Sequence, residues 1–288
     1  MKSKAFCPGH ISGFFEPVYF NNDFSRSGSR GAGVSINLGA FSEVTAIESS
    51  IQNIEIFING KKSPAPVTKL AIEFLIAKND LNITVKTKLD LPMGQGFGMS
   101  GSGALSSTIA LSKICGLSSS DAMKAAHFAE VNLKTGLGDV VSSFIGGFEV
   151  RKTPGIPPWG IIEHIPGNYN IVLCVVGKKV NTSKIISNKN SMNIVSDYGK
   201  LCTKKILEKP SVENLFYLSN VFSKKTGLAN KKLQKIIDEC NNYGKASMCM
   251  LGNSIFALGK TNELSNILSK YGKTYVCSVD EYGARLIE

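Results

Sequence analysis

Residues 91–104 carry five glycines and two serines between a strand-like run and a helix-like run. In the run before them, residues 82–91, apolar side chains occupy alternate positions, which is typical of a half-buried strand. In the run after them, residues 104–115, Ala, Leu and Ile recur at helical spacing, and Gly116 follows as a helix-ending residue. Glycines let backbone N–H groups approach an anion closely, and a helix N-terminus adds positive potential. The stretch therefore predicts a phosphate-binding site, with a plain flexible loop as the alternative.

Two common phosphate-binding motifs fit these residues poorly. A P-loop needs a Lys directly before a Ser or Thr, and no Lys occurs between residues 90 and 112. Gly96, Gly98 and Gly101 do satisfy the dinucleotide-binding spacing G-x-G-x-x-G. However, the strand before them alternates, whereas a central parallel strand is continuously apolar. Asp121, which would have to bind the ribose, follows three serines and is better explained as part of a helix cap.

Two other segments carry polar groups that could bind an anionic substrate. Residues 28–34 are glycine-dense, and the Ser29 hydroxyl, the Arg30 guanidinium and nearby backbone N–H groups could bind a carboxylate there. An ordinary hairpin turn is the alternative for this loop. On a helix predicted over residues 118–134, His127 and Glu130 lie one turn apart on the same face, for which a solvated polar face is the alternative.

Several motifs together resemble those of the GHMP kinases, which phosphorylate small metabolites with ATP. Residues 92–100 read Pro-x-Gly-x-Gly-Phe-Gly-x-Ser, similar to the glycine loop of that family, although Gly-Ser-Gly follows in place of the usual Ser-Ala. Residues 7–13 resemble the family's opening segment, and residues 136–147 resemble its Gly-x-x-Asp-x-x-x-Ser…Gly-Gly signature. These motifs lie in the first 150 or so residues. Their combination is similar to a branch of the family in which the acceptor is pantoate.

The resemblance implies a role for each matching residue. The residues expected to bind ATP are Pro92, Gly94, Gly96, Gly98, Ser100, Gly101 and Ser102. Ser100 and Glu130 would hold Mg²⁺, and Asp139 would accept the proton of the acceptor hydroxyl, so these three form the expected catalytic set. The candidates for binding the acceptor are His10, Ser29, Arg30, His127 and Arg151. A glycine-poor segment over residues 245–258 stands at the position of the family's third motif, and its part in phosphate binding stays open.

The resemblance also implies an α+β fold of two domains. Residues 1–155 would form a domain like the second domain of ribosomal protein S5, and residues 156–288 a ferredoxin-like α/β sandwich. The chain of 288 residues is long enough for both. Residues 153–166 are rich in Pro and Gly, which predicts a linker between the domains.

The composition indicates an ordinary globular protein, 43% hydrophobic and 19% charged. The sequence contains neither a signal-peptide pattern nor a run of about 18 apolar residues, so we expect a cytoplasmic protein without a membrane segment. The seven scattered cysteines predict reduced core residues, and neither a disulfide framework nor a zinc site. The net charge of +11 suits anionic substrates, and the basic residues are not interleaved with aromatic ones as in a nucleic-acid-binding surface.

Three questions stay open at this level. Mevalonate, homoserine or shikimate could replace pantoate as the acceptor. Because the S5-like fold also occurs in RNA-binding proteins, an RNA-binding module is the competing class. In that case Asp139 and Glu130 would be dispensable, and salt would weaken binding steeply. The third question is the oligomeric state, for which a homodimer is one possibility.

Overall fold

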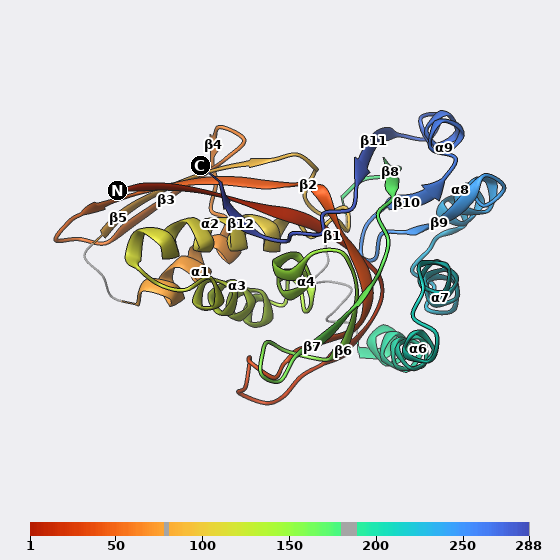
Figure 1. Ribbon diagram of the computed structural model, residues 1–288, viewed down its shortest axis with the longest axis horizontal. Helices are drawn as coiled ribbons and strands as arrows, with labels where there is room; N and C mark the ends of the chain where they lie inside the picture. Colours follow the sequence, from red (N-terminus) through yellow and green to blue (C-terminus); the bar gives the residue numbers. More distant parts are fainter. Residues whose placement is uncertain (78–80, 180–188, 288) are drawn as a thin grey trace.

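A long antiparallel pair of strands runs from the N-terminal end of the molecule to the C-terminal helices and strands (Figure 1). The computed structural model of the protein describes residues 1–77, 81–179 and 189–287. β1 (Lys2–Val18) pairs with β2 (Gly28–Glu48), with register shifts between Pro8 and Gly9 and between Ser12 and Phe14. Irregularities of this kind bend a strand, and in Figure 1 the pair curves from the layer of α1–α3 towards the C-terminal part of the chain.

The larger sheet is built on this pair. Its strand order is β12-β1-β2-β5-β3-β4, with β6 paired to β2 and β7 paired to β6. The bounds of the added strands are β3 (Asn53–Ile58), β4 (Lys61–Lys62), β5 (Leu81–Leu89), β6 (Phe148–Thr153), β7 (Ile161–Ile165) and β12 (Arg285–Ile287). One face is covered by α1 (Pro66–Ile76), α2 (Met99–Cys115), α3 (Ser119–Leu133) and α4 (Asp139–Ile145). Buried apolar side chains between these helices and the sheet form one hydrophobic cluster.

The C-terminal part has a second sheet. Its strands are β8 (Asn170–Val175), β9 (Gly244–Met248), β10 (Ser254–Gly259) and β11 (Lys273–Ser278). Its helices are α6 (Lys189–Glu208), α7 (Val212–Lys225), α8 (Lys231–Cys240) and α9 (Thr261–Leu268). The antiparallel order β11-β8-β10-β9 is 4-1-3-2 when the strands are counted within this part. The α+β fold class predicted from the sequence is confirmed.

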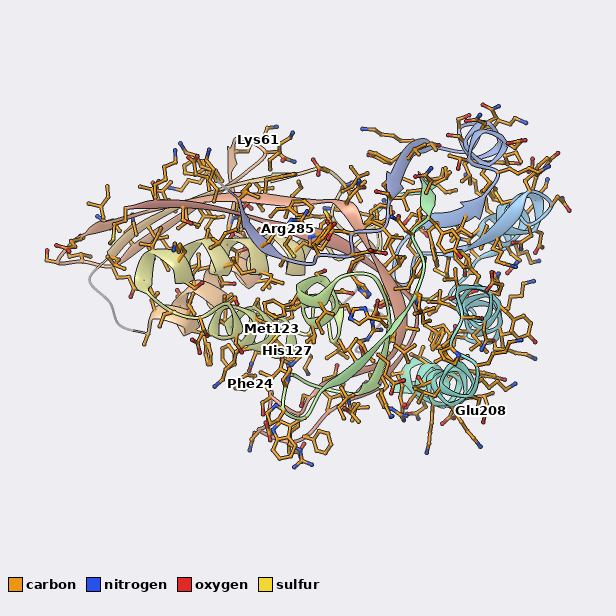
Figure 2. All side chains as sticks on the ribbon, viewed as in Figure 1. Phe24, Lys61, Met123, His127, Glu208 and Arg285 are labelled. Atoms are coloured by element: carbon orange, nitrogen blue, oxygen red, sulfur yellow. The ribbon has the colours of Figure 1, made fainter. Side chains whose placement is uncertain are left out.

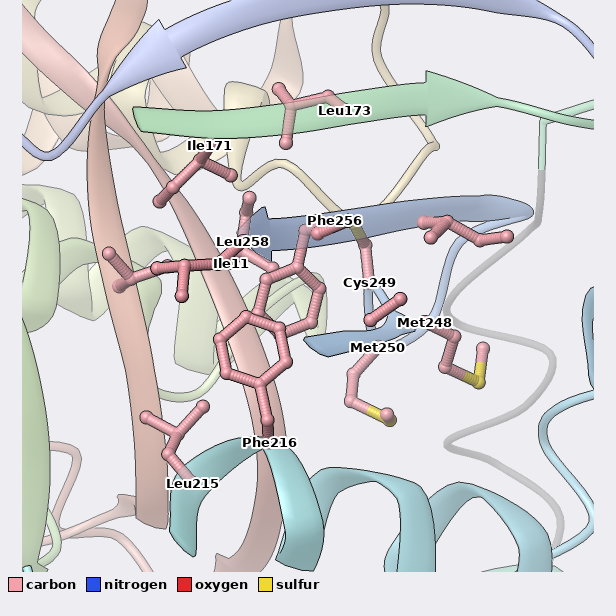
Figure 3. Close-up of a cluster of buried hydrophobic side chains, with 14 of the residues drawn as sticks. Ile11, Ile171, Leu173, Leu215, Phe216, Met248, Cys249, Met250, Phe256 and Leu258 are labelled. Atoms are coloured by element: carbon pink, nitrogen blue, oxygen red, sulfur yellow. The ribbon is translucent and has the colours of Figure 1, made fainter. Parts of the chain in front are cut away.

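Both sheets contribute to one continuous core where α7 packs. The ring of Phe222 lies 6.4 Å from that of Phe14 and 5.8 Å from that of Phe15, measured between centroids. Figure 3 shows Phe216 of α7 against Phe256 of β10, whose ring centroids are 4.7 Å apart. The larger hydrophobic cluster therefore joins β1 to the C-terminal helices and strands.

Three local predictions are wrong in an informative way. Residues 28–33 are not a loop, because they form ladders with β1 on one side and β6 on the other. Residues 153–166 are not a simple linker, because β7 turns back and pairs with β6 in the larger sheet. The helix expected from residue 104 begins at Met99. The domain division at residue 155 stays a prediction.

Other local expectations agree with the structure. Ser118 caps α3, and with Asp121 it forms a capping box. The sequence over residues 65–78 also predicts a helix, which the structure shows as α1; Lys78, the last residue of that prediction, lies outside the described residues. All seven cysteines are free, and six of them are buried. Within the described ranges, the helices lack the combination of length and apolar character needed to cross a bilayer.

The packing of α7 on β1 gives a prediction about stability. Phe222 is 0% exposed, so Phe222→Ala should lower the free energy of unfolding by about 3–5 kcal/mol through the lost contacts and the cavity left behind. Tyr217→Ala on the same helix, where the side chain is 63% exposed, should change it by less than about 0.5 kcal/mol. Urea unfolding measures both, and equal losses in the two variants would contradict the packing described here.

Candidate active site

One pocket lies where the two halves of the chain meet. Its wall is made by β1 and β2, by the segment from α3 to α4, by the loop before α2, and by the loop between β9 and β10. The lining residues are Ser12, Phe15, Ser29, Gly94, Gly96, Phe97, Gly98, Met99, Ser100, Glu130, Thr135, Gly136, Leu137, Gly138, Asp139, Met250 and Leu251. Most of the residues that the sequence marks for phosphate and acid–base chemistry therefore share one cavity.

The loop before α2, residues 90–98, is called the glycine loop here. Gly94, Gly96 and Gly98 have φ values of 74°, 77° and 65°, a backbone region that suits glycine. Gly98 is the N-cap of α2, and the Ser102 N–H is the donor to its carbonyl. The three preceding N–H groups, at residues 99–101, therefore stand at the helix start, where backbone donors have no partner within the helix. This is the geometry of an anion site.

The predicted ATP-binding residues divide into two groups. Gly94, Gly96, Gly98 and Ser100 line the pocket, and Ser100 is exposed. The remaining three have other surroundings: Pro92 is exposed outside the lining, Gly101 lies against Glu130, and Ser102 is buried. The Ser102 hydroxyl donates to the carbonyl of Pro8 at 2.8 Å, so this side chain ties α2 to β1 and does not face the pocket.

Glu130 brings a buried carboxylate into the cavity. Its side chain is 2% exposed, and no hydrogen bond to its carboxylate is formed within the described part of the chain. Two glycines make room for it, because a Cβ on Gly136 would lie 2.5 Å from its Oε2 and one on Gly101 would lie 3.0 Å from its Oε1. Burial, and then the charge of Asp139, raises the pKa of Glu130 well above its ordinary value. A cation in the pocket would stabilise the ionised carboxylate and so offset both the burial and the repulsion from Asp139.

Asp139 begins a chain of alternating charges that runs away from the pocket. Its Oδ1 lies 2.7 Å from Nδ1 of His10, and Nε2 of His10 lies 3.0 Å from Oε1 of Glu149. Arg151 then donates through Nη1 to the same oxygen of Glu149. We call these four residues the charge chain. Asp139 is its partly exposed end, and the other three are buried.

The geometry of the charge chain favours a protonated His10. An ionised carboxylate only accepts hydrogen bonds, so a ring held between two carboxylates must donate from both nitrogens, as only the imidazolium can. Burial by itself would lower the pKa of His10, but the charge of Glu149 and the hydrogen bonds to Asp139 and Glu149 outweigh it and raise this pKa above 6.5. His10, predicted to bind the acceptor, instead contacts the predicted catalytic carboxylate.

The structure separates the other acceptor-binding candidates. Ser29 lines the pocket. Arg30 does not, because its guanidinium pairs with Glu16 at 3.0 Å and donates to the carbonyl of residue 152. Arg151 is buried behind the lining, where its Nη2 donates to Ser12 and its Nε has no hydrogen-bond partner within the described residues.

His127 also lies away from the pocket lining. Its Nε2 is 3.0 Å from the carbonyl oxygen of Phe24 and 2.9 Å from that of Ser27, and Figure 2 shows His127 and Phe24 close together. Burial lowers the pKa of His127, which favours a neutral ring. The predicted direct contact with the acceptor is therefore corrected: His127 anchors the loop that leads into Ser29.

The glycine-poor third segment packs directly on the glycine loop. Gly252 meets the backbone of Gln95 so closely that no Cβ would fit, and the Ser254 hydroxyl donates to the same carbonyl oxygen of Gln95. Leu251 has a φ of 61°, and its neighbour Met250 also lines the pocket. This segment thus reaches the pocket through its backbone turn, although it has few glycines.

Sequence reasoning missed Glu149, Ser12 and Thr135. Glu149 had a readable signal, since a charged residue inside a short apolar strand, two positions from Arg151, predicts a buried ion pair on one face. Ser12 and Thr135 had none, because small hydroxyl residues are common everywhere in the chain.

Comparisons with known proteins agree with this geometry. The profile of the GHMP kinases N terminal domain matches residues 66–147. A solved structure named as a phosphotransferase related to the CoA biosynthesis pathway superposes with a TM-score of 0.91 and 29% identity, covering 100% of this chain and 99% of that one. These similarities define the class of the protein: it has the fold of the small-molecule kinases.

Two curated relatives narrow the family. The pantoate kinase of Methanocaldococcus jannaschii is 35% identical over 95% of this chain and 99% of that protein. The pantoate kinase of Thermococcus kodakarensis is 34% identical over 91% of this chain and 89% of that protein. The chain therefore belongs to the pantoate kinase family of the GHMP kinases.

The raised pKa of Glu130 gives a prediction about pH and stability. The folded protein holds a proton on Glu130 more tightly than the unfolded chain does, so stability falls as the pH rises from about 4.5 through the folded value. Glu130→Gln should therefore be more stable than the unsubstituted protein at about pH 8, by about 1.4 kcal/mol for each unit of pKa shift. Near pH 4 the two proteins should have the same free energy of unfolding. Urea unfolding in the presence of EDTA measures it at both pH values.

Glu208→Gln, at the exposed end of α6, is the matched control and should show no such difference at either pH. A Glu130→Gln protein no more stable than the unsubstituted one at about pH 8 would show that the carboxylate is not strained by its surroundings.

Proposed function

We propose that the protein transfers the γ-phosphoryl group of ATP to pantoate, giving 4-phosphopantoate in coenzyme A biosynthesis. The observation that carries the proposal is the meeting of the glycine loop, Glu130 and Asp139 in one pocket. The family resemblance of the whole chain supports ATP as the phosphoryl donor and pantoate as the acceptor.

The glycine loop and the start of α2 would bind the phosphates of ATP. Phosphoryl transfer depends on positioning and on neutralising charge, and the N–H groups at residues 99–101 supply both without a side chain. A mostly apolar cavity, which includes Val67, Leu89 and Met93, adjoins this helix start and shares Met99, Ser100 and Thr135 with the pocket. It offers room for the nucleoside.

Mg²⁺ fits the donors that are present. Glu130 offers a buried carboxylate without a hydrogen-bonded partner in the described residues, and Ser100 offers a hydroxyl. Among the described residues, no group of three or more His, Cys, Asp and Glu could hold a metal by itself. That suits a cation that prefers few protein ligands together with water and phosphate oxygens. When bound, Mg²⁺ would offset negative charge on the phosphates.

Asp139 would act on the acceptor hydroxyl. Its Oδ1 is held by His10, and its Oδ2 has no hydrogen-bond partner within the described residues. In the reaction, the hydroxyl oxygen bonds to the γ-phosphorus and the bond from that phosphorus to the β–γ bridging oxygen breaks. ADP leaves, and the hydroxyl proton passes to Asp139.

The remaining wall suits an acceptor with a carboxylate and a branched carbon. Ser12, Ser29 and Thr135 line it with hydroxyl groups, and the buried Oγ1 of Thr135 has no hydrogen-bond partner among the described residues. Phe15 and Leu137 add apolar surface. Pantoate has a carboxylate, two hydroxyls and a carbon with two methyl groups, and it could use both kinds of surface.

The proposal also includes where the enzyme works and with which partners. We expect it to work in the cytoplasm, as a homodimer, and without binding nucleic acid. Analytical ultracentrifugation and an RNA titration at low salt test the last two expectations.

A mass-spectrometric assay with ATP, Mg²⁺ and a panel of pantoate, mevalonate, homoserine and shikimate tests the reaction. Pantoate should gain one phosphate, and Asp139→Asn should lower kcat by about 10³-fold or more while it retains ATP binding. Asp197→Asn, at an exposed position of α6, should behave as the unsubstituted enzyme. Phosphorylation of another panel member alone would reject pantoate, and no product from any of them would favour the RNA-binding alternative.

A further inference from the structure

Glu149 is a fully buried carboxylate that does not line the pocket. It is 0% exposed in β6, and three donors converge on its Oε1: Nε2 of His10 at 3.0 Å, the Ser142 hydroxyl at 3.2 Å, and Nη1 of Arg151. Removing a carboxylate from water costs several kcal/mol unless it is paired and hydrogen-bonded. An apolar side chain would fill a buried sheet position without that cost, so the charge itself needs an explanation.

The neighbouring strand is adapted to this contact. Gly33 of β2 is the ladder partner of Glu149. A Cβ on Gly33 would lie 2.6 Å from Nε2 of His10 and 3.1 Å from Oε1 of Glu149. The same Cβ would first meet the backbone carbonyl oxygen of Ile11, so a side chain at position 33 would crowd β1 as well as the ring and the carboxylate.

We propose that Glu149 is a positioning residue for phosphoryl transfer: it holds His10 as an imidazolium, which orients Asp139 through Oδ1 and leaves Oδ2 free for the acceptor hydroxyl. The proposal rests on the proposed function of Asp139 as the proton acceptor. Glu149 itself touches neither substrate.

The reason for a second carboxylate behind the ring is the crowding of negative charge in the pocket. Asp139 faces the cavity together with Glu130, and ATP and the acceptor would bring more negative charge. A protonated His10 places a positive charge against Asp139, with Nδ1 at 2.7 Å from Oδ1, and so offsets the repulsion among these negative groups.

On the side of the ring away from Asp139, the negative charge of Glu149 stabilises the imidazolium form of His10. The positive charge of Arg151 in turn balances that of Glu149. The charged groups against the ring are Asp139 of α4 and Glu149 and Arg151 of β6, with Arg151 Nη1 at 3.4 Å from Nε2. β2 and the glycine loop contact His10 with Gly33 and Gly98, which carry no charge. The raised pKa of His10, with Glu149 as the largest favourable cause, agrees with this geometry.

The test compares the ring nitrogens of His10 in ¹⁵N-histidine-labelled protein without substrates. The chain has only three histidines, so the His10 signals are identified by their loss in His10→Gln. At about pH 7.5 we expect two protonated ring nitrogens in the unsubstituted protein and one in Glu149→Gln. In the same variant kcat should fall roughly 10- to 100-fold, with both KM values within about twofold. Glu149→Asp should restore most of the charge and of kcat.

Glu163→Gln, on exposed β7 of the same sheet, is the matched control and should alter neither the ring nor kcat. The proposal is overturned by a neutral ring in the unsubstituted protein, by an unchanged ring in folded Glu149→Gln, or by a neutral ring with unchanged kcat.

If circular dichroism shows that Glu149→Gln does not fold, the same spectra of Asp139→Asn test the proposal instead. That substitution is at the more exposed end of the charge chain and should disturb folding less. Glu149 should keep the ring doubly protonated there, and a neutral ring would overturn the proposal. The spectra need no substrate, so a failure of pantoate in the acceptor panel would reject the proposed function without deciding the charge of His10.

Discussion

The pairing of β1 with β2 is the constraint on which the other parts of this protein depend. The first half of β1 packs under α1–α3 through Ala5 and Cys7, and its second half packs against the C-terminal part through Ile11 and Phe14. His10 lies between these halves, beside the two register shifts of the ladder. A strand shared by two cores cannot slide without exposing one of them, so the position of His10 relative to the pocket is held from both sides.

Around this strand, the pocket combines two ways of handling charge. The glycine loop presents backbone N–H groups at the start of α2, a geometry that suits an anion without adding any side-chain charge. Behind Asp139, in contrast, whole charges alternate through His10 and Glu149 to Arg151. Each buried ion is costly alone, but the chain is neutral in sum and is hydrogen-bonded at every link. The arrangement places His10 directly against a carboxylate that faces the pocket together with Glu130.

The C-terminal part completes the pocket through contacts of backbone with backbone. Gly252 approaches Gln95 of the glycine loop, and the Met250 N–H donates to the carbonyl of Ser12 in β1 at 3.2 Å. The neighbouring Leu251 lines the cavity in a left-handed conformation. These contacts join segments from both parts of the chain around one pocket.

The sequence by itself determined the features that depend on near neighbours: the glycine loop and helix after it, the cap at Ser118, and the positions of Glu130 and Asp139. Such features rest on local hydrogen bonds and backbone preferences. Only the tertiary structure decided side-chain direction across the sheet. Glu149 meets His10 across 139 residues, while Arg30 and His127, predicted to face the acceptor, turn to other partners. Strand register sets those directions, and register follows from how distant strands bury their apolar faces.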